Sequence, residues 1–443
     1  MTLWTPALQE SPAPIYVRVA DALERDVRTG TLLAGSRLPT HRELARSLGV
    51  TPVTVTRAYG EAARRGLVES SIGRGTFVRS IRRETAPPEE IDLSTNVINI
   101  PLPAASAAVL RRAADSLESN YLIGPGSERH RAAGAAWIGR RTDPARVIVT
   151  AGTQHALFLA FVTATRPGDT VFAESVTYHG AKALASLLNL RLAPLPMDRY
   201  GILPDAFARA CRAKTAKVLY TIPSLHNPTG IVMPDKRRRD LAAVAEKFGV
   251  TVIEDDVSGF LLDKTPPPIA AFAPERTIFI TGIGKALAPA LRIGYIAAPD
   301  AWIPRLQSAL AASILFTSPL LAEIVASWIE DGTAARIIAA KRAEAALRNR
   351  VARRILGEMA EKTDPRSQHL WIELPRRWTG DAFAEEARRR HIRVASASSF
   401  VVGTDIPRAV RLSIGAPPSV AELETALHVI MGIEEERAEE TVV

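Results

Sequence analysis

The chain has 443 residues, which suits two or three domains rather than one core. Hydrophobic residues make up 47% and charged residues 23%, and no apolar run reaches the eighteen or so residues of a membrane span, which excludes a membrane-embedded protein. The single cysteine, Cys211, excludes an intramolecular disulfide and a cysteine-cluster metal site. Because the N-terminus lacks a signal-peptide pattern, we expect a cytoplasmic protein. We expect no metal site.

The net charge of +9 is unevenly distributed. Residues 1–83 carry thirteen Arg, no Lys and seven acidic residues, so a net charge of +6 falls in less than a fifth of the chain. A basic excess confined to one small segment is typical of nucleic-acid binding, although a solvated basic face has the same composition. The order of the predicted elements in this segment distinguishes between these two explanations of the basic charge.

Three helices are predicted in the N-terminal segment. Apolar residues recur three and four apart over residues 15–28. A second helix has Thr40 as its N-cap and Glu43 at the capping-box position, and it ends at Gly49. A third helix is expected over residues 52–65, because proline suits the first turn. Two short helices joined by a glycine-containing turn predict a helix-turn-helix.

Two strands are predicted after these helices. Residues 67–70 and 75–78 alternate in the manner of strands, and Ile72-Gly73-Arg74 forms a basic turn between them. Such a hairpin is a wing. Residues from about 14 to 79 resemble the winged helix-turn-helix of GntR-type bacterial regulators, on the motifs Arg37-Leu38-Pro39-Thr40-His41-Arg42-Glu43-Leu44-Ala45, Gly49-Val50-Thr51, Arg64-Arg65-Gly66-Leu67-Val68 and Gly73-Arg74-Gly75-Thr76-Phe77-Val78.

In that family the third helix enters the major groove and the wing tip approaches the minor groove. The resemblance implies that Arg42 contacts a phosphate and that Arg74 and Gly75 contact DNA through the wing. The groove or phosphate candidates on the third helix are Thr51, Thr54, Thr56 and Arg57. Some relatives have a basic residue where Pro52 stands. A helical interaction domain with solvated arginines is the alternative, but it does not explain the helix-turn-helix-wing order.

Beyond a predicted linker at residues 80–90, strand-like runs alternate with helical ones. This alternation predicts a three-layer α/β domain with a largely parallel sheet, whose ligands bind at the strand ends. The strand-like runs cover residues 147–150, 170–173, 217–220, 250–253 and 277–280.

Four residues of this region supply the groups that a cofactor with an aldehyde, a pyridine ring and a phosphate requires. An aldehyde needs an amine, the ring nitrogen a carboxylate, and the phosphate cationic or N–H partners. In chain order the residues are Asn227 of Asn-Pro-Thr-Gly, Asp255 after a strand, Lys285 and Arg292. This order resembles the aspartate aminotransferase superfamily (fold type I). From Ile91 onward the chain resembles the aminotransferase-like half of MocR-type regulators, which fuse a GntR winged helix to such a domain.

The resemblance implies that the cofactor is pyridoxal 5'-phosphate. It makes Lys285 the catalytic candidate, which holds the cofactor covalently, and gives Asp255 to the ring nitrogen and Arg292 to the phosphate. Asn227 aligns with the donor to the cofactor's phenolic oxygen. The neighbouring Asp256 leaves the choice of carboxylate open by one residue, and we favour Asp255.

Three further parts of the cofactor site follow from the resemblance. Gly152, Thr153 and Gln154 follow a strand and open a helix, where free backbone N–H groups suit an anion, and in the family they bind the phosphate. A plain N-cap by Thr153 is the alternative. Tyr178 aligns with the aromatic residue that stacks on the ring, although a core tyrosine would look the same. Arg411 aligns with the arginine that binds a substrate's α-carboxylate.

The implied architecture has two domains. An α+β winged helix-turn-helix domain occupies residues 1–79. The linker consists of residues 80–90. An α/β three-layer fold type I transferase domain occupies residues 91–443, with a large subdomain at about 121–325 and a small C-terminal α+β subdomain at about 326–443.

The chain departs from the family pattern at three positions. Ser258 stands where relatives have a tyrosine, and Gly282 and Gly284 replace the serines of a Ser-x-Ser-Lys run. Each change removes a side-chain hydrogen bond worth on the order of 1 kcal/mol. Backbone N–H groups or Thr281 are candidates to replace part of the phosphate contact.

We therefore expect a homodimeric DNA-binding transcription regulator that uses pyridoxal phosphate, together with an amino acid or amine, as its effector. Catalysis by the aminotransferase-like domain would be weak or absent. An active aminotransferase with an accessory winged helix is the alternative. A DNA-binding protein whose large domain no longer holds the cofactor is the third.

Overall fold

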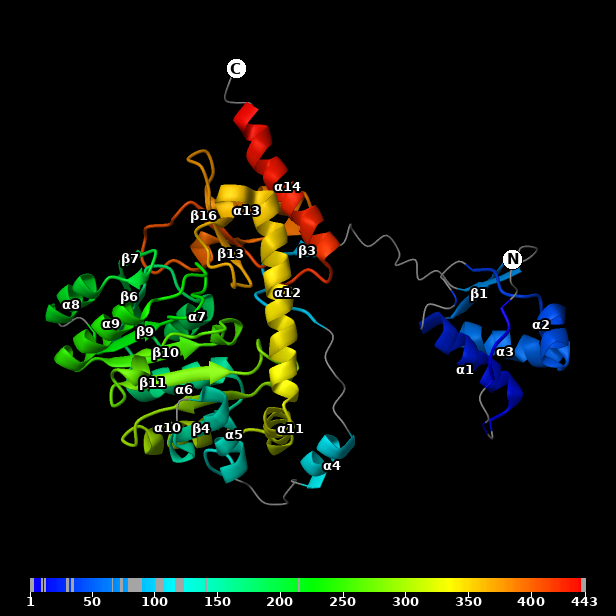
Figure 1. The fold of residues 1–443 in the computed structure, drawn as a ribbon, viewed down its shortest axis with the longest axis horizontal. Coiled ribbons are helices and arrows are strands. Elements are labelled where there is room, and N and C mark those ends of the chain that lie inside the picture. Colours follow the sequence, from blue (N-terminus) through cyan, green and yellow to red (C-terminus); the bar gives the residue numbers. More distant parts are fainter. Residues whose placement is uncertain are drawn as a thin grey trace. The chain divides into compact units, whose positions relative to one another are not determined.

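The computed structural model describes most of the chain, namely residues 4–8, 11, 13–28, 32, 36–65, 67–71, 75–78, 90–100, 107–115, 123–139, 142–213 and 216–439. The chain divides into two compact units, Met1–Glu89 and Glu90–Val443, and each is described by itself (Figure 1). The predicted linker lies outside the described residues except for Glu90, and so does the predicted basic turn with Arg74.

The first unit is the predicted winged helix. The capping box is present: the Thr40 hydroxyl accepts from the Glu43 N–H at 3.3 Å, and the Glu43 carboxylate accepts from the Thr40 N–H at 2.8 Å. Gly49 ends the second helix in the left-handed conformation, with φ 67°. The elements are α1 (Ile15–Arg28), α2 (His41–Leu48), α3 (Pro52–Arg64) and the antiparallel strands β1 (Val68–Ser71) and β2 (Gly75–Val78).

One apolar cluster holds this unit together. Leu23 of α1, Leu44 of α2 and Val55 of α3 are fully buried in it. The Tyr59 hydroxyl of α3 donates to the Pro39 carbonyl at 2.8 Å and thereby ties α3 to the turn before α2. The faces of α2 and α3 that do not enter the cluster are therefore free to carry polar contacts.

The second unit is built on a seven-stranded sheet in which only β12 runs antiparallel to the others. This confirms the predicted three-layer α/β fold. The five predicted strands are present, whereas β6 and β12 were not predicted. In sheet order the strands are β4 (Val147–Thr150), β12 (Gly294–Ala297), β11 (Thr277–Gly282), β10 (Thr251–Asp256), β9 (Val218–Thr221), β5 (Thr170–Glu174) and β6 (Arg191–Leu195).

Helices cover both faces of this sheet (Figure 1). Strand residues alternate between two clusters: Ile253 of β10 packs with the helices of one face, and Val252 with those of the other. The first face is covered by α6 (Thr153–Ala164), α7 (His179–Leu187) and α10 (Ile303–Ile314). The other face is covered by α5 (Glu128–Ile138), α8 (Pro204–Arg212), α9 (Asp235–Phe248) and α11 (Pro319–Glu330).

A smaller α+β layer follows in sequence, beyond the long helix α12 (Thr333–Leu356). Its three-stranded sheet consists of β13 (Leu370–Glu373), β16 (Ala409–Leu412) and β15 (Ala395–Ser396), and α13 (Gly380–Arg389) and α14 (Val420–Glu439) pack with it. The strand β3 (Ile91–Asp92) pairs with β14 (Ile392–Arg393), which brings the start of the second unit into this layer. The remaining α-helix is α4 (Ala107–Asp115), which packs on α11, and the remaining strands, β7 (Met197–Asp198) and β8 (Gly201–Ile202), form a hairpin.

Among the described residues, no helix is long and apolar enough to cross a membrane. Nor does that part of the chain bring three or more His, Cys, Asp or Glu side chains together as a metal site would require.

Candidate functional site

All eight predicted cofactor residues line one cavity of about 270 Å³ at the carboxyl ends of the parallel strands. They come from six separate segments of the chain, so the fold brings them together. The set is Gly152, Thr153, Gln154, Tyr178, Asn227, Asp255, Lys285 and Arg292.

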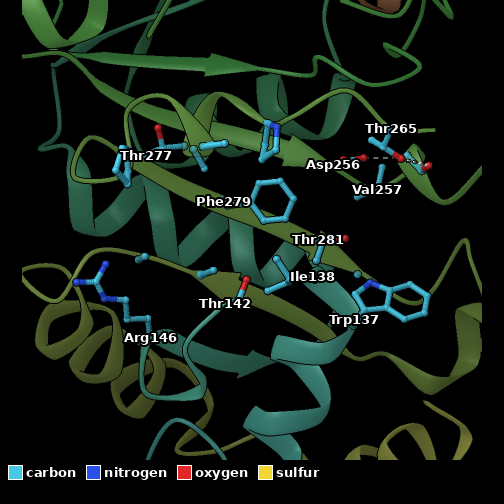
Figure 2. A pocket seen from close by; sticks show the side chains of 18 of the residues that line it. Trp137, Ile138, Thr142, Arg146, Asp256, Val257, Thr265, Thr277, Phe279 and Thr281 are labelled. Atoms are coloured by element: carbon cyan, nitrogen blue, oxygen red, sulfur yellow. Dashed lines mark hydrogen bonds between the residues drawn. The ribbon is translucent and has the colours of Figure 1, made fainter. Parts of the chain in front are cut away.

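A larger groove of about 670 Å³ lies along the other side of β11, with Phe279 at its centre and Trp137 at its edge (Figure 2). Its two arginines are already bound: Arg146 pairs with Asp300 at 2.7 Å, and Arg342 donates to backbone carbonyls. No lysine is among the described residues that line this groove. The smaller cavity therefore holds the groups suited to covalent chemistry.

The ionisable pair of the cavity is Lys285 and Asp255. Burial lowers the pKa of the Lys285 amine, and the charge of Asp255 opposes that shift. Burial also raises the pKa of Asp255, while a hydrogen bond from Tyr220 and the charge of Lys285 lower it. An amine with a depressed pKa is more often unprotonated and hence more nucleophilic.

Asp255, and not Asp256, faces the cavity. The Tyr220 hydroxyl donates to Oδ2 of Asp255 at 2.9 Å, and Oδ1 is buried with no hydrogen-bond partner in the described structure. Asp256, one residue on along β10, turns to the groove of Figure 2 and accepts from the Gly259 N–H at 2.8 Å. A buried carboxylate oxygen without a partner fits the protonated nitrogen of a pyridine ring.

The suggestion that Thr281 replaces a phosphate contact is wrong. Thr281 lines the groove on the other side of β11, as its label in Figure 2 shows, and it does not line the cavity. The reason is the alternation of a strand: Thr281 pairs with Asp256, and both face away from the side to which Asp255 points.

Asp255→Asn is expected to remove the decrease in the free energy of unfolding that the cofactor-free wild type shows as pH rises from about 4 through about 6. Burial raises the pKa of Asp255 from 3.8 to about 6, so the folded chain binds this proton more tightly than the unfolded chain. The stability from this group is complete below a pH of about 4 and is lost as pH rises through about 6. Denaturant unfolding at several pH values checks this.

The matched control is Asp405→Asn, in which an exposed carboxylate is replaced. It should leave the free energy of unfolding unchanged across the same pH range. The same pH dependence of stability in wild type and in Asp255→Asn would show that the buried carboxylate carries no such penalty.

The opposite end of the cavity is suited to an anion. Gly152, with φ 87°, begins α6 without a side-chain cap, so the first N–H groups of that helix are available. Arg292 lies beside it and has a left-handed backbone (φ 48°), which costs a non-glycine residue about 1 kcal/mol or more. A guanidinium next to the uncapped start of a helix is suited to a phosphate.

Thr153 explains why residue 282 is a glycine. A Cβ atom built on Gly282 would overlap the Thr153 hydroxyl, so no side chain fits there while Thr153 keeps its place. Thr153 also lines the cavity. The hydroxyl that relatives supply from position 282 is thus available here from Thr153, on the facing element.

Tyr178 and Gln154 hold each other at the cavity wall. The Tyr178 hydroxyl donates to the Gln154 side-chain carbonyl at 3.1 Å, and the Gln154 amide donates to the Gly180 carbonyl at 3.1 Å. The side chain of Gln154 is therefore engaged with Tyr178 and Gly180, which leaves its backbone N–H for an anion. These bonds fix the orientation of the Tyr178 ring, as stacking on a flat ligand requires.

Arg411 reaches the site through Asn227. Nη1 of Arg411 donates to Oδ1 of Asn227 at 2.7 Å, Nη2 donates to the Ser94 carbonyl, and the guanidinium lies over the Phe400 ring at 4.9 Å. With its oxygen bound to Arg411, Asn227 presents its amide N–H groups as donors. Burial lowers the pKa of Arg411 to about 10, and no carboxylate lies within ion-pair distance in the described part of the chain.

Sequence reasoning missed three contributors to the site. Tyr220 was assigned only to a strand; the register of β9 places it opposite Ile253, from where its hydroxyl reaches Asp255, two residues further along β10. Ser94 supplies a carbonyl to Arg411, and Asn96 lines the cavity with both amide atoms buried and without a described partner. No local motif marks Ser94 or Asn96, because both lie in an irregular segment.

In the first unit, the DNA residues predicted for α2 and α3 lie on the exposed sides of these helices. Arg42 and Arg57 are exposed, and no carboxylate pairs with either in the described residues. Thr51 caps α3, accepting from the Thr54 N–H at 3.3 Å, and the Thr56 hydroxyl donates to the Pro52 carbonyl at 3.0 Å. The hydroxyls therefore also stabilise the helix.

Arg64 and Arg65 of this unit are paired internally. Arg65 pairs with Asp21 at 2.7 Å and with Glu61 at 2.8 Å, and Arg64 pairs with Glu61 at 2.7 Å. Gly75, at the start of the second wing strand, has φ 110° and lies beside the Arg37 guanidinium, which sequence reasoning had not placed there. Arg42 and Arg57 thus differ from Arg64 and Arg65, because no described carboxylate neutralises them.

Comparisons with known proteins agree with both units. A family model described as Aminotransferase class I and II matches residues 88–430, and one described as Bacterial regulatory proteins, gntR family matches residues 15–78. The chain is 32% identical over 443 residues to the HTH-type transcriptional regulator YdeF of Bacillus subtilis, with 96% of each chain covered.

A second relative and one solved structure extend this comparison. The HTH-type pyridoxine biosynthesis transcriptional regulator PdxR of Corynebacterium glutamicum is 29% identical over 308 residues, which cover 65% of this chain and 67% of the relative. An archaeal alanine:glyoxylate aminotransferase has a similar structure, with a TM-score of 0.73, 21% identity, and 79% of this chain and 91% of that one covered. The structural likeness shows the fold.

Proposed function

We propose that pyridoxal phosphate, together with an amino compound, is the effector of this chain. The chain belongs to the MocR-type transcription regulators, in which a GntR-family DNA-binding domain is joined to an aminotransferase class I and II domain. The chain is a DNA-binding regulator with a pyridoxal phosphate-binding domain. The observation that carries the proposal is the buried Asp255 oxygen without a partner, in the same cavity as Lys285. DNA binding with and without the cofactor tests it.

The residues present fit the cofactor. Asp255 would hold the ring nitrogen, and the Asn227 amide the phenolic oxygen. The uncapped start of α6, the Thr153 hydroxyl and Arg292 would hold the phosphate. The chemistry that the cofactor supplies when bound is an aldehyde that reacts with amines. Lys285 is the amine of the cavity.

We propose an amino acid or amine as the second ligand. Arg411 is buried, has no described carboxylate partner, and keeps its Nε–H without an acceptor. An unpaired buried guanidinium favours a ligand carboxylate, because pairing removes much of the cost of burying its charge. The amino group of such a ligand would compete with Lys285 for the cofactor aldehyde and so link ligand binding to the conformation of the domain.

Ser258 and Gly284 favour a signalling role over strong transaminase activity. They replace a tyrosine and a serine whose hydroxyl groups relatives place near the cofactor. An active aminotransferase remains the competing function. Incubation with pyridoxal phosphate and a panel of amino acids, with detection of the pyridoxamine form, separates the two. Multiple turnovers with any donor would favour the enzyme.

We also propose that the regulator is a homodimer that acts in the cytoplasm, where its DNA lies. Ile123, Ile314, Leu315 and Leu320 are 65%, 38%, 42% and 36% exposed. Val149 links the segments that carry them. Its N–H donates to the Pro125 carbonyl, close to Ile123, and its carbonyl accepts from the Thr317 hydroxyl at 3.0 Å, between Leu315 and Leu320. A cluster of exposed large apolar residues is typical of an interface. Sedimentation of the purified protein tests the dimer.

Arg57→Ala is expected to weaken DNA binding about tenfold at low salt and to reduce the salt-dependence slope by about 1, because one phosphate contact is lost. Fluorescence anisotropy at several salt concentrations measures both. Arg64→Ala is the control on the same helix, since Arg64 already pairs with Glu61. If both variants weaken binding equally, α3 does not face DNA through Arg57.

A further inference from the structure

The long helix α12 holds the loops of the cofactor cavity by their backbone. The Lys341 ammonium donates to the Lys285 carbonyl at 2.7 Å. The next residue, Arg342, donates to the Phe260 carbonyl at 2.7 Å and to the Leu262 carbonyl at 3.0 Å, in the segment that follows Asp255. Two adjacent residues of one helix therefore fix the two segments that carry the ionisable pair of the cavity.

The same helix also holds the C-terminal layer. Arg348, fully buried, donates to the Ile414 carbonyl at 3.0 Å and to the Pro417 carbonyl at 2.8 Å. Ile414 lies just beyond β16, the strand that carries Arg411. Lys341 and Arg348 are seven residues apart, two helical turns or about 10 Å on one face. A single rigid element thus joins the backbone of Lys285 to the strand of Arg411.

Lys341 is an unusual residue to find in this place. It is 2% exposed, and Ile337 and Ala345, one turn away on either side, belong to buried apolar clusters. No carboxylate pairs with it among the residues that the structure describes, and burial lowers its pKa to about 8. A lysine in such surroundings destabilises the fold compared with an apolar residue, so a role beyond packing is needed to explain it.

We propose that Lys341 is a positioning residue, which holds the Lys285 carbonyl and thereby couples the cofactor lysine, through α12, to the strand that carries Arg411. Occupation of Lys285 then changes the order of the segment that binds the second ligand's carboxylate. This inference rests on the proposed function, because it needs pyridoxal phosphate at Lys285. The coupling is mechanical: it requires the hydrogen bond and the rigid helix, and no contact of Lys341 with the cofactor.

The test is hydrogen exchange of residues 409–417, followed by mass spectrometry, with and without pyridoxal phosphate. In wild type we expect the cofactor to slow exchange of this segment about five- to tenfold. In Lys341→Met, which keeps the length of the side chain and removes the donor, the cofactor should still bind but the slowing should be lost. Lys362→Met, at an exposed lysine paired with Glu373, is the control and should behave as wild type.

Two results overturn the inference alone: cofactor-dependent slowing in Lys341→Met equal to that in wild type, or bound cofactor in wild type without slowing. If wild type binds no pyridoxal phosphate by absorbance, the proposed function fails as well. Lys341→Gln, which retains an N–H donor, is the second variant. We expect it to restore part of the slowing, and it serves in place of the methionine variant if that protein does not fold.

Discussion

Lys285→Ala is expected to abolish covalent retention of pyridoxal phosphate. The wild-type protein should show an absorption band at about 420 nm after addition of the cofactor, because Lys285 is the only lysine among the described residues that line the cavity. The variant should lack the band at any cofactor concentration. After borohydride reduction, wild type should carry the cofactor mass on the peptide that contains Lys285, and the variant should carry none.

The control for this experiment is Lys236→Ala, at an exposed lysine on α9. It should keep the band and the mass shift of wild type. A band that persists in Lys285→Ala would place the cofactor on another lysine and would contradict the site described here.

Gly282→Ser is expected to weaken pyridoxal phosphate binding, although it introduces the serine that relatives carry. The added Cβ would overlap the Thr153 hydroxyl and displace it from the phosphate site, and the loss of one hydrogen bond to a charged phosphate costs about 1.5–3 kcal/mol, or about 10- to 150-fold in affinity. Thr153→Ala should also weaken binding, because the hydroxyl beside the phosphate site is lost. Titration of the cofactor, followed by absorbance, measures each dissociation constant.

The double variant Thr153→Ala with Gly282→Ser is the decisive comparison. With the threonine hydroxyl removed, the serine has room and supplies a hydroxyl from the facing element. Its affinity should exceed that of Gly282→Ser alone, so the two effects should not add. Additive losses would mean that Thr153 and residue 282 do not share one position at the phosphate site.

Local patterns were sufficient to predict much of the fold. The capping box of Thr40 and Glu43 and the glycine at position 49 define α2 within a few residues, so the helix-turn-helix was predicted correctly. Apolar runs predicted the buried parallel strands because both faces of that sheet are covered. Strand β6 was missed since its residues are largely exposed or half-buried, including Arg191 and Pro194.

The resemblance to the aminotransferase family predicted that the eight cofactor residues come together. The residues that contact them depend on the register of the strands, which the resemblance did not provide. Strand alternation sends Asp255 and Asp256 to opposite faces, which the sequence could not decide until the packing of β10 was known. The same alternation removes Thr281 from the cavity. The bond from Tyr220 and the contact between Gly282 and Thr153 join residues far apart in sequence, so no local pattern predicts them.

The most direct test of the central claim is the binding of the purified regulator to the DNA that flanks its own coding region, measured by gel shift with and without pyridoxal phosphate. We predict that the cofactor changes the affinity of wild type at least about fivefold, the lower end of usual allosteric couplings. Lys285→Ala should bind the same DNA but show no change. Identical binding of wild type with and without the cofactor, over a panel of added amino acids, would contradict a role for pyridoxal phosphate as effector.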